Sequence, residues 1–328
     1  MKFMIAGLGS IGRRHLRNLE TLGEDDILLY RTHQSTLPEE ELKRYPMETD
    51  LGRALSYQPD AVIIANPTAK HMEVAIPAAK AGCALFVEKP IAAHLDDALL
   101  LEEVLNKNRN IFFSAYQFRF NPGLRKVKEL LDECTVGRPL SFTAYWGEYL
   151  PHWHPWEDYR KSYAAKKELG GGVVLTLCHP LDYLRWMFGD VRELFAITGH
   201  VSDLELDVED FADAVIEFKC GVYGMLHLDY FRRDKRQDLE IVCEKGTIYW
   251  EYATSAVKLF LPDGTHLEFP APPGFDRNQM FLDEMTHFIN VLRRKETPLC
   301  TFQDGWKALE FAWGILHSAG YKQRVVFG

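Results

Sequence analysis

The N-terminal stretch MKFMIAGLGSIGRR, residues 1–14, decides the fold of this chain. Residues 2–6 are mostly apolar and predict a buried strand, and residues 13–22 predict the helix that follows it. Between them, Gly7, Gly9 and Gly12 complete the pattern G-x-G-x-x-G. The first glycine permits a tight turn, the second lets a pyrophosphate approach the backbone, and the third lets helix and strand pack closely. The stretch predicts a phosphate-binding βαβ unit; a glycine-rich turn without a ligand is the alternative.

Strands and helices continue to alternate through the first third of the chain. Further strands are expected at 27–30, 61–65, 84–87 and 111–115, and further helices at 71–81 and 95–106. Such alternation is typical of parallel βαβ units in a doubly wound sheet. We therefore expect an α/β Rossmann domain over residues 1–120.

The pattern changes near Asn121, where strand-like runs begin to follow one another with less helix between them. These runs lie at 140–149, 192–200, 211–218, 221–232, 239–244, 247–252 and 256–261, and helices are expected from Pro180 and at 278–293 and 305–318. Neighbouring strands joined by short turns indicate a mostly antiparallel sheet. Residues 121–328 are therefore expected to form an α+β domain with an open-faced sheet. This domain would bind substrate and assemble a homodimer or homotetramer.

Composition narrows the classes of protein. The 328 residues fit two domains, and 38 basic against 47 acidic residues give a net charge of -9. That charge argues against general nucleic-acid binding but leaves room for a local basic pocket. No apolar run approaches the roughly 20 residues that span a bilayer, so no membrane contact is expected. The six cysteines are scattered without a C-x-x-C pair, which favours a reducing cytoplasm over disulfides or structural zinc.

The end of the second strand bears on the choice of dinucleotide. Sites specific for NAD usually place an acid there, whereas this strand ends in Tyr30, Arg31 and Thr32. Because Arg31 would pair with a ribose phosphate, NADP(H) is favoured over NAD(H); a solvated surface arginine is the alternative. The expected cofactor contacts are Gly7, Gly9, Ser10, Ile11, Gly12, Arg13, Arg31, Thr32, Asn66, Pro67, His71, Glu88 and Lys89.

Lys89 is the first candidate reactive residue. Glu88-Lys89-Pro90 ends the fourth strand, and ligands bind at the carboxyl ends of strands in such sheets. The Lys89 ammonium could hydrogen-bond a substrate hydroxyl and stabilise alkoxide character. The Lys89–Pro90 bond is a candidate cis peptide. A surface lysine at a strand end is the alternative.

His179 is the second candidate. Pro180 suits the start of a helix, which places His179 at the N-cap, and Gly189 suits its end. The positive end of the helix dipole should keep the imidazole neutral and available as a base. Asp182, three residues on, could orient the ring. A buried histidine that only caps the helix is the alternative.

These motifs together resemble the Gfo/Idh/MocA oxidoreductase family, named for glucose–fructose oxidoreductase and inositol dehydrogenase, over nearly the whole chain. The resemblance rests on Gly7–Gly12, Glu88-Lys89-Pro90 and the segment from Gly170 to Asp182. It implies a Rossmann domain, an open-faced sheet domain and nicotinamide-dependent redox chemistry on a sugar, polyol or nucleotide-sugar carbon. It also implies catalytic roles for Lys89 and His179.

One position departs from that family's pattern. Many relatives carry an aspartate where this chain has Thr176, and a threonine cannot act as a base near neutral pH. Proton transfer would then rest on His179 and Lys89. A dinucleotide-binding sensor or regulatory protein without turnover is the alternative function.

The stretch from Tyr149 to Lys161 is rich in aromatic and cationic side chains. It looks like a subgroup tied to sialic-acid-like or surface-sugar biosynthesis, and its aromatic faces and cations suit a sugar ring with an acidic group. A hydrophobic loop that plugs a domain junction is the alternative. His152 and His154 lack further ligands at suitable spacing, so no metal is expected. The expected substrate contacts are Arg119, Trp153, Tyr159, Arg160, Lys161, Thr176, His179 and Asp182.

Overall fold

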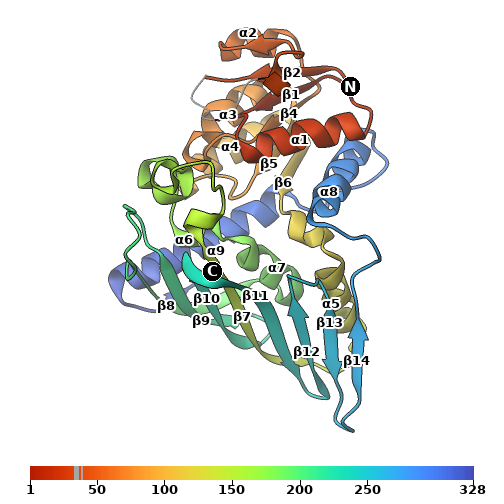
Figure 1. Ribbon diagram of the computed structural model, residues 1–328, viewed down its shortest axis with the longest axis vertical. Helices are drawn as coiled ribbons and strands as arrows, with labels where there is room; N and C mark the ends of the chain where they lie inside the picture. The colour runs from red at the N-terminus through yellow and green to blue at the C-terminus, as the bar shows by residue number, and fades with distance from the viewer. Residues whose placement is uncertain (33–36, 38–39) are drawn as a thin grey trace. The chain divides into compact units, whose positions relative to one another are not determined.

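The computed structural model describes residues 1–32, 37 and 40–328 (Figure 1). The chain divides into two compact units. The first contains residues 1–116, 168–170 and 277–309, and the second contains 117–167, 171–276 and 310–328. Residues 277–309 thus pack with the first unit, although the sequence division at residue 120 grouped them with the second.

The first unit is built on a parallel six-stranded sheet with the order β3-β2-β1-β4-β5-β6. Its strands are β1 (Phe3–Ala6), β2 (Ile27–Tyr30), β3 (Met47–Glu48), β4 (Ala61–Ile64), β5 (Ala84–Glu88) and β6 (Phe112–Ala115). The expected α/β fold is confirmed. Strands β1, β4, β5 and β6 are buried along their whole length, as sheets covered on both faces require. The sequence prediction missed β3, which is only two half-buried residues long.

Helices follow these strands. They are α1 (Ser10–Thr21), α2 (Leu51–Ser56), α3 (His71–Lys80) and α4 (Leu95–Asn108). Helix α1 is amphipathic and buries Leu16 and Leu19. The sequence prediction missed α2, a short helix whose N-terminus is capped by Asp50.

Helix α8 (Arg277–Leu292) returns to the first unit from the far end of the chain. Asn278 Nδ2 donates to Asn18 Oδ1 on α1 at 3.0 Å. Further along α8, the Phe288 ring lies 5.2 Å from that of Phe86 on β5. Helix α8 therefore completes the core of the dinucleotide-binding unit.

The second unit is built on a nine-stranded sheet with the order β14-β13-β12-β11-β7-β10-β9-β8-β15. Its strands are β7 (Pro139–Tyr149), β8 (Val191–Gly199), β9 (Phe211–Phe218), β10 (Tyr223–Asp229), β11 (Phe231–Cys243), β12 (Gly246–Glu251), β13 (Val257–Phe260), β14 (His266–Phe269) and β15 (Val325–Val326). Only β10 and β7 pair in parallel among these neighbours, so the expectation of a mostly antiparallel sheet is confirmed.

The expected boundary between the strands 221–232 and 239–244 is wrong. The chain turns at Tyr230, and β11 then runs unbroken from Phe231 to Cys243. Its first half is the polar run Arg232–Gln237, which lacks an apolar alternation that a sequence reading could detect. A register shift against β7 falls between Phe231 and Arg236, where the ladder is interrupted.

Helices cover one face of this sheet. They are α5 (Pro122–Asp132), α6 (Val173–Thr176), α7 (His179–Phe188) and the C-terminal part of α9 (Phe302–Tyr321). Short 3₁₀ turns are η1 (Glu40–Leu42), η2 (Thr68–Lys70), η3 (Gln117–Phe120), η4 (Leu150–His152), η5 (Tyr159–Lys161), η6 (Tyr163–Ala165) and η7 (Lys167–Leu169). Ring contacts of Tyr183 with Trp250 and of Phe188 with Phe142 pack α7 on the sheet.

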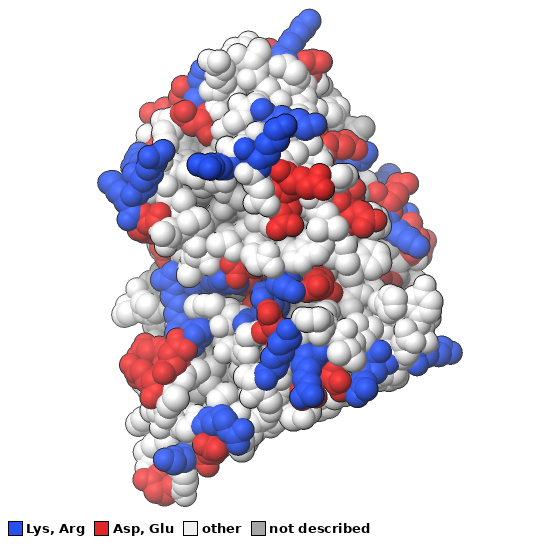
Figure 2. Space-filling model, turned by 180° about the vertical axis from the view of Figure 1, so that it is seen from behind, with Lys and Arg blue, Asp and Glu red and all other residues white. Residues whose placement is uncertain are grey.

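Figure 2 shows Lys and Arg intermingled with Asp and Glu on the face seen from behind. None of the helices in the described ranges combines the length and the apolar character that crossing a membrane requires.

Candidate active site

The carboxyl edge of the parallel sheet carries the glycine turn. Gly7 follows β1 with a φ of 93°, and a Cβ atom there would lie 2.4 Å from the Asn66 nitrogen. A Cβ on Gly12 would lie 2.0 Å from the Gly7 oxygen. Both positions therefore need glycine for the turn to close.

Gly9 differs, because a Cβ atom there would meet nothing within 4 Å. It is the N-cap of α1, beside Ser10 and Ile11 in the first turn, where backbone N–H groups lack intrahelical partners. An exposed backbone with free donors at a helix N-terminus fits a pyrophosphate. The residues present therefore suit the expected dinucleotide.

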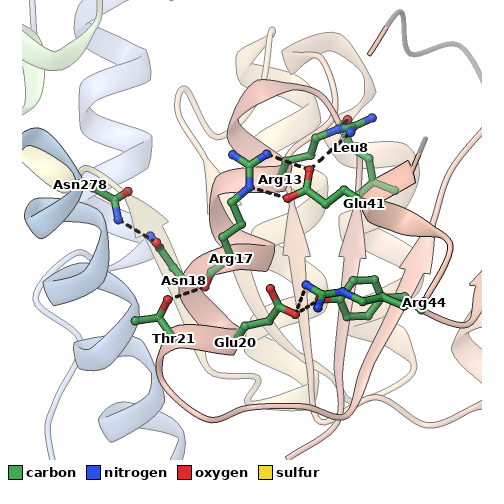
Figure 3. A network of polar contacts seen from close by, with 10 residues as sticks. Leu8, Arg13, Arg17, Asn18, Glu20, Thr21, Glu41, Arg44 and Asn278 are labelled. Atoms are coloured by element: carbon green, nitrogen blue, oxygen red, sulfur yellow. Dashed lines mark hydrogen bonds and ion pairs between the residues drawn. The ribbon is translucent and has the colours of Figure 1, made fainter. Parts of the chain in front are cut away.

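Arg13 braces this turn from within the protein. Its Nε donates to the Leu8 oxygen at 3.0 Å, and its Nη1 lies 3.5 Å from Glu41 Oε2. Arg17 also binds Glu41, and these side chains converge beside α1 (Figure 3). The hydrogen bond from Arg17 holds the pKa of Glu41 below its usual value. Arg13, which was expected to contact the cofactor, is 5% exposed, and its side chain is bonded to the backbone of the Gly7–Gly12 turn.

Two other strands present expected cofactor residues at the same edge. Arg31, 4% exposed, follows β2 and donates its backbone N–H to the Glu48 oxygen, while Thr32 is exposed. Asn66 and Pro67 follow β4. His71 fixes this second loop, because Nε2 lies 3.0 Å from the Asn66 oxygen and Nδ1 lies 3.2 Å from the Ile91 oxygen. Burial lowers the pKa of His71.

Lys89 follows β5 at this edge and is half-buried. The Lys89–Pro90 bond is cis, as anticipated. Glu88 Oε2 accepts the Lys89 backbone N–H at 3.2 Å, and Glu88 Oε1 lies 2.7 Å from Nε2 of His15 on α1. His15 and Glu88 are 0% and 7% exposed. The sequence analysis missed His15; its place three residues after the glycine pattern, on the inner side of α1, was the available signal.

In the second unit, His179 is the first residue of α7, and Cys178 rather than His179 is the N-cap. The expected helix end at Phe188 and Gly189 is confirmed. The imidazole is 7% exposed and lies 4.6 Å from the Phe118 ring and 5.8 Å from the Trp146 ring. Its Nε2 lies 3.3 Å from the Gln117 amide nitrogen.

Asp182 binds Arg119, a partner that the sequence analysis did not foresee. Arg119 Nη2 lies 2.6 Å from Asp182 Oδ1, and Nε lies 3.0 Å from Oδ2. Arg119 and Asp182 are 3% and 0% exposed, so this is a buried, bidentate ion pair. Both residues, expected to contact substrate, hold η3 against α7.

The glycines at residues 170–172, just before α6, leave room for the carboxyl group of Glu209. Gly172 has a φ of 106°, and a Cβ there would lie 2.5 Å from Glu209 Oε1. That oxygen accepts the Val174 N–H at 3.1 Å, and burial raises the pKa of Glu209. Thr176 is 2% exposed and lies close to Tyr230, whose hydroxyl donates to the Ala164 oxygen at 3.5 Å. The sequence analysis missed Glu209, which comes from the β8–β9 connection.

The aromatic stretch from Tyr149 to Lys161 contacts other residues of the second unit. The Trp153 ring lies 5.6 Å from the Tyr230 ring, and the Tyr159 hydroxyl accepts the Glu205 N–H at 3.1 Å. Arg160 binds Asp158 and Glu205, while Lys161 is exposed. The described residues contain no cluster of three or more His, Cys, Asp or Glu side chains arranged to hold a metal.

Each unit thus gathers its own part of the expected site. The first brings the glycine turn, Arg31, Asn66 and Lys89 to one sheet edge. The second arranges Arg119, Thr176, His179 and Asp182 around α6 and α7.

Two family models match most of the chain. Residues 1–116 match the model of an oxidoreductase family with an NAD-binding Rossmann fold, and residues 124–249 match the GFO/IDH/MocA C-terminal domain. The chain is 28% identical to myo-inositol 2-dehydrogenase of Thermotoga maritima, over 99% of this chain and 98% of that protein. It is 25% identical to scyllo-inositol 2-dehydrogenase (NAD(+)) of Bacillus subtilis, over 93% and 90%.

A solved structure agrees in fold. The WlbA dehydrogenase of Bordetella pertussis, in complex with NADH and UDP-GlcNAcA, has a TM-score of 0.85 at 22% identity, covering 100% of this chain and 99% of that one. The two family matches cover more than half of the chain, which therefore belongs to the Gfo/Idh/MocA family of oxidoreductases. The family favours an oxidoreductase over a sensor without turnover.

The exposed Gly9 and the buried Gly12 of this turn yield a matched pair of variants. Gly9→Ala should fold normally but weaken NADH binding at least about tenfold, because the methyl group enters the phosphate's space. Gly12→Ala should also lower the free energy of unfolding by about 1–3 kcal/mol, because its Cβ clashes with the Gly7 oxygen. Nicotinamide fluorescence and thermal unfolding measure the two effects. If Gly9→Ala binds NADH as tightly as the wild type does, the glycine turn is not the phosphate-binding site.

Proposed function

We propose that this protein oxidises or reduces a hydroxyl or carbonyl carbon of a sugar, polyol or nucleotide sugar with a nicotinamide dinucleotide. The observation that carries the proposal is Lys89, which follows β5 at the same sheet edge as the Gly7–Gly12 turn. Ligands of open parallel sheets bind at that edge. The names of relatives, myo-inositol and scyllo-inositol dehydrogenases, support the substrate class.

The proposed mechanism divides the work between two side chains. A bound nicotinamide supplies the acceptor or donor of the hydride. In the oxidative direction, Lys89 hydrogen-bonds the substrate hydroxyl and stabilises its alkoxide character, and His179 takes the proton as the carbonyl forms. In reduction, His179 returns the proton. The proposed substrate contacts are Arg119, Trp153, Tyr159, Arg160, Lys161, Thr176 and His179. Asp182, which the sequence also suggested as a contact, acts through Arg119.

Lys89→Met is the direct test of this function. It should lower kcat by about 10²- to 10³-fold, as the loss of one electrostatic donor does, while NADH binding changes little. Reduction of the dinucleotide is followed by absorbance with a panel that includes myo-inositol and UDP-GlcNAcA. Lys80→Met, an exposed lysine at the end of α3, is the control and should retain wild-type turnover. Full turnover by Lys89→Met would exclude the proposed role.

We further propose that Arg31 gives the site a preference for NADP(H). The end of β2 carries no acid that would repel a ribose phosphate, and an arginine follows Tyr30 directly. A guanidinium can bind a phosphate through two parallel hydrogen bonds. The name of scyllo-inositol 2-dehydrogenase (NAD(+)) and the complex of the WlbA dehydrogenase with NADH both point to the dinucleotide without the ribose phosphate, which defines the competing outcome.

Titration with NADPH and NADH decides this point. The wild type should bind NADPH more tightly, and Arg31→Ala should weaken NADPH at least about tenfold while NADH binding stays within about twofold. Arg53→Ala, at an exposed position on α2, is the control. Tighter binding of NADH by the wild type would refute the Arg31 argument and leave the oxidoreductase function intact.

A second copy of the chain is the proposed occupant of the open sheet face. Phe195, Val215 and Met225 align across β8, β9 and β10 and are 46%, 56% and 55% exposed. Their neighbours along the strands, such as Ala196 and Leu226, face the buried side. A patch of this kind is costly to leave in water. We propose a homodimer or homotetramer in the cytoplasm, because a reducing compartment suits a chain with six scattered cysteines.

Val215→Lys together with Met225→Lys should convert the oligomer to monomers, because burying two ammonium groups without partners is strongly unfavourable. Light scattering after size-exclusion chromatography measures the mass. Leu100→Lys, an exposed apolar position on α4, serves as the control and should keep the wild-type mass. A monomeric wild type would rule this assembly out.

A further inference from the structure

The turn η3 holds the start of α7 through three consecutive side chains. The Gln117 amide nitrogen lies 3.3 Å from His179 Nε2, and the Phe118 ring centroid lies 4.6 Å from that of the imidazole. Arg119 completes the set with its bidentate pair to Asp182. The backbone of the turn is itself fixed, because Arg125 Nε donates to the Arg119 oxygen at 2.9 Å.

Residue 117 is a polar glutamine at a buried position. Gln117 is 4% exposed, and a buried amide is destabilising unless it is hydrogen-bonded. A methionine of the same length would fill this space without that cost. The imidazole nitrogen facing the amide supplies the reason, since His179 is itself 7% exposed among aromatic rings.

We propose that Gln117 is a positioning residue for His179, whose side-chain N–H donates to Nε2 and fixes both the ring orientation and its tautomer. An amide nitrogen can only donate, so Nε2 must present its lone pair. A neutral imidazole with a lone pair on Nε2 carries its proton on Nδ1. The use of this tautomer in proton transfer rests on the proposed function, but the tautomer itself does not.

The arrangement also explains how the base is kept ready. The Nε2 lone pair is the group that would accept a substrate proton. We expect a substrate hydroxyl to take the place of the amide at this nitrogen, and Gln117 to hold the ring until that exchange occurs.

Nuclear magnetic resonance of protein labelled with ¹⁵N-histidine tests this without any substrate. The His179 signals are identified by their loss in His179→Gln, and spectra are recorded at alkaline pH, where imidazoles are neutral. The wild type should show Nδ1 protonated and Nε2 unprotonated. Gln117→Met should raise the Nε2–H population several-fold, and Gln117→Glu, which offers an acceptor, should make Nε2–H the main form.

Gln237→Leu is the matched control, since Gln237 is a buried glutamine that binds Glu148. It should leave the His179 tautomer unchanged. A wild type that already carries its proton on Nε2, or an unaltered tautomer in both Gln117 variants, would overturn the inference. Gln117→Glu keeps the shape of the side chain and serves where Gln117→Met fails to fold.

A kinetic readout separates this inference from the proposed function. With any substrate that turns over, Gln117→Met should lower kcat and leave the Kd of the dinucleotide unchanged, and Gln117→Glu should displace the pH–rate profile. If no substrate turns over, the proposed function fails while the spectra still decide the role of Gln117.

Discussion

The turn from β1 to α1 closes only because two of its residues lack a Cβ atom, and the first unit depends on that closure. With Gly12 against the Gly7 oxygen, α1 starts close to the sheet and directs its first N–H groups to the carboxyl edge. The inner side of the same helix then places His15 against Glu88. The glycine turn and the backbone of Lys89 therefore belong to one packed structure, which the buried contact between His15 and Glu88 joins.

The second unit depends in a similar way on the pair formed by Arg119 and Asp182. Loss of one partner from a buried ion pair typically costs about 3–5 kcal/mol, because the other charge is left without compensation. The pair fixes the distance between η3 and α7, and this distance brings Gln117 and Phe118 to the imidazole of His179. The proposed base is thus supported by residues that precede it by about sixty positions.

The sequence was sufficient for features that depend on local spacing. The glycine pattern, the apolar strands of the first sheet, the cis Lys89–Pro90 bond and the helix after Pro180 were all anticipated from neighbouring residues. Contacts between distant residues were not, because no periodicity links His15 with Glu88 or Arg119 with Asp182.

Two errors have simple local causes. The start of α7 was misplaced by one residue because proline is accepted at either of the first two helical positions. The first half of β11 escaped detection because its side chains are polar and its pairing with β7 is carried by backbone groups on either side of a register shift. The role of Gln117 could not be read from the sequence at all, since it follows from burial and from one interatomic distance.

The path of the chain sets an order of assembly. Helix α8 supplies Asn278 to α1 and Phe288 to the ring of Phe86, yet in the sequence it follows every strand of the second unit's sheet except β15. At a synthesis rate of about 5–20 residues per second, the residues between the two parts of the first unit delay α8 by on the order of ten seconds or more. During that interval the part of the Rossmann core that α8 covers, including Phe86, stays exposed to solvent. The Rossmann unit is therefore completed only after the strands β7 to β14 of the second unit have been synthesised.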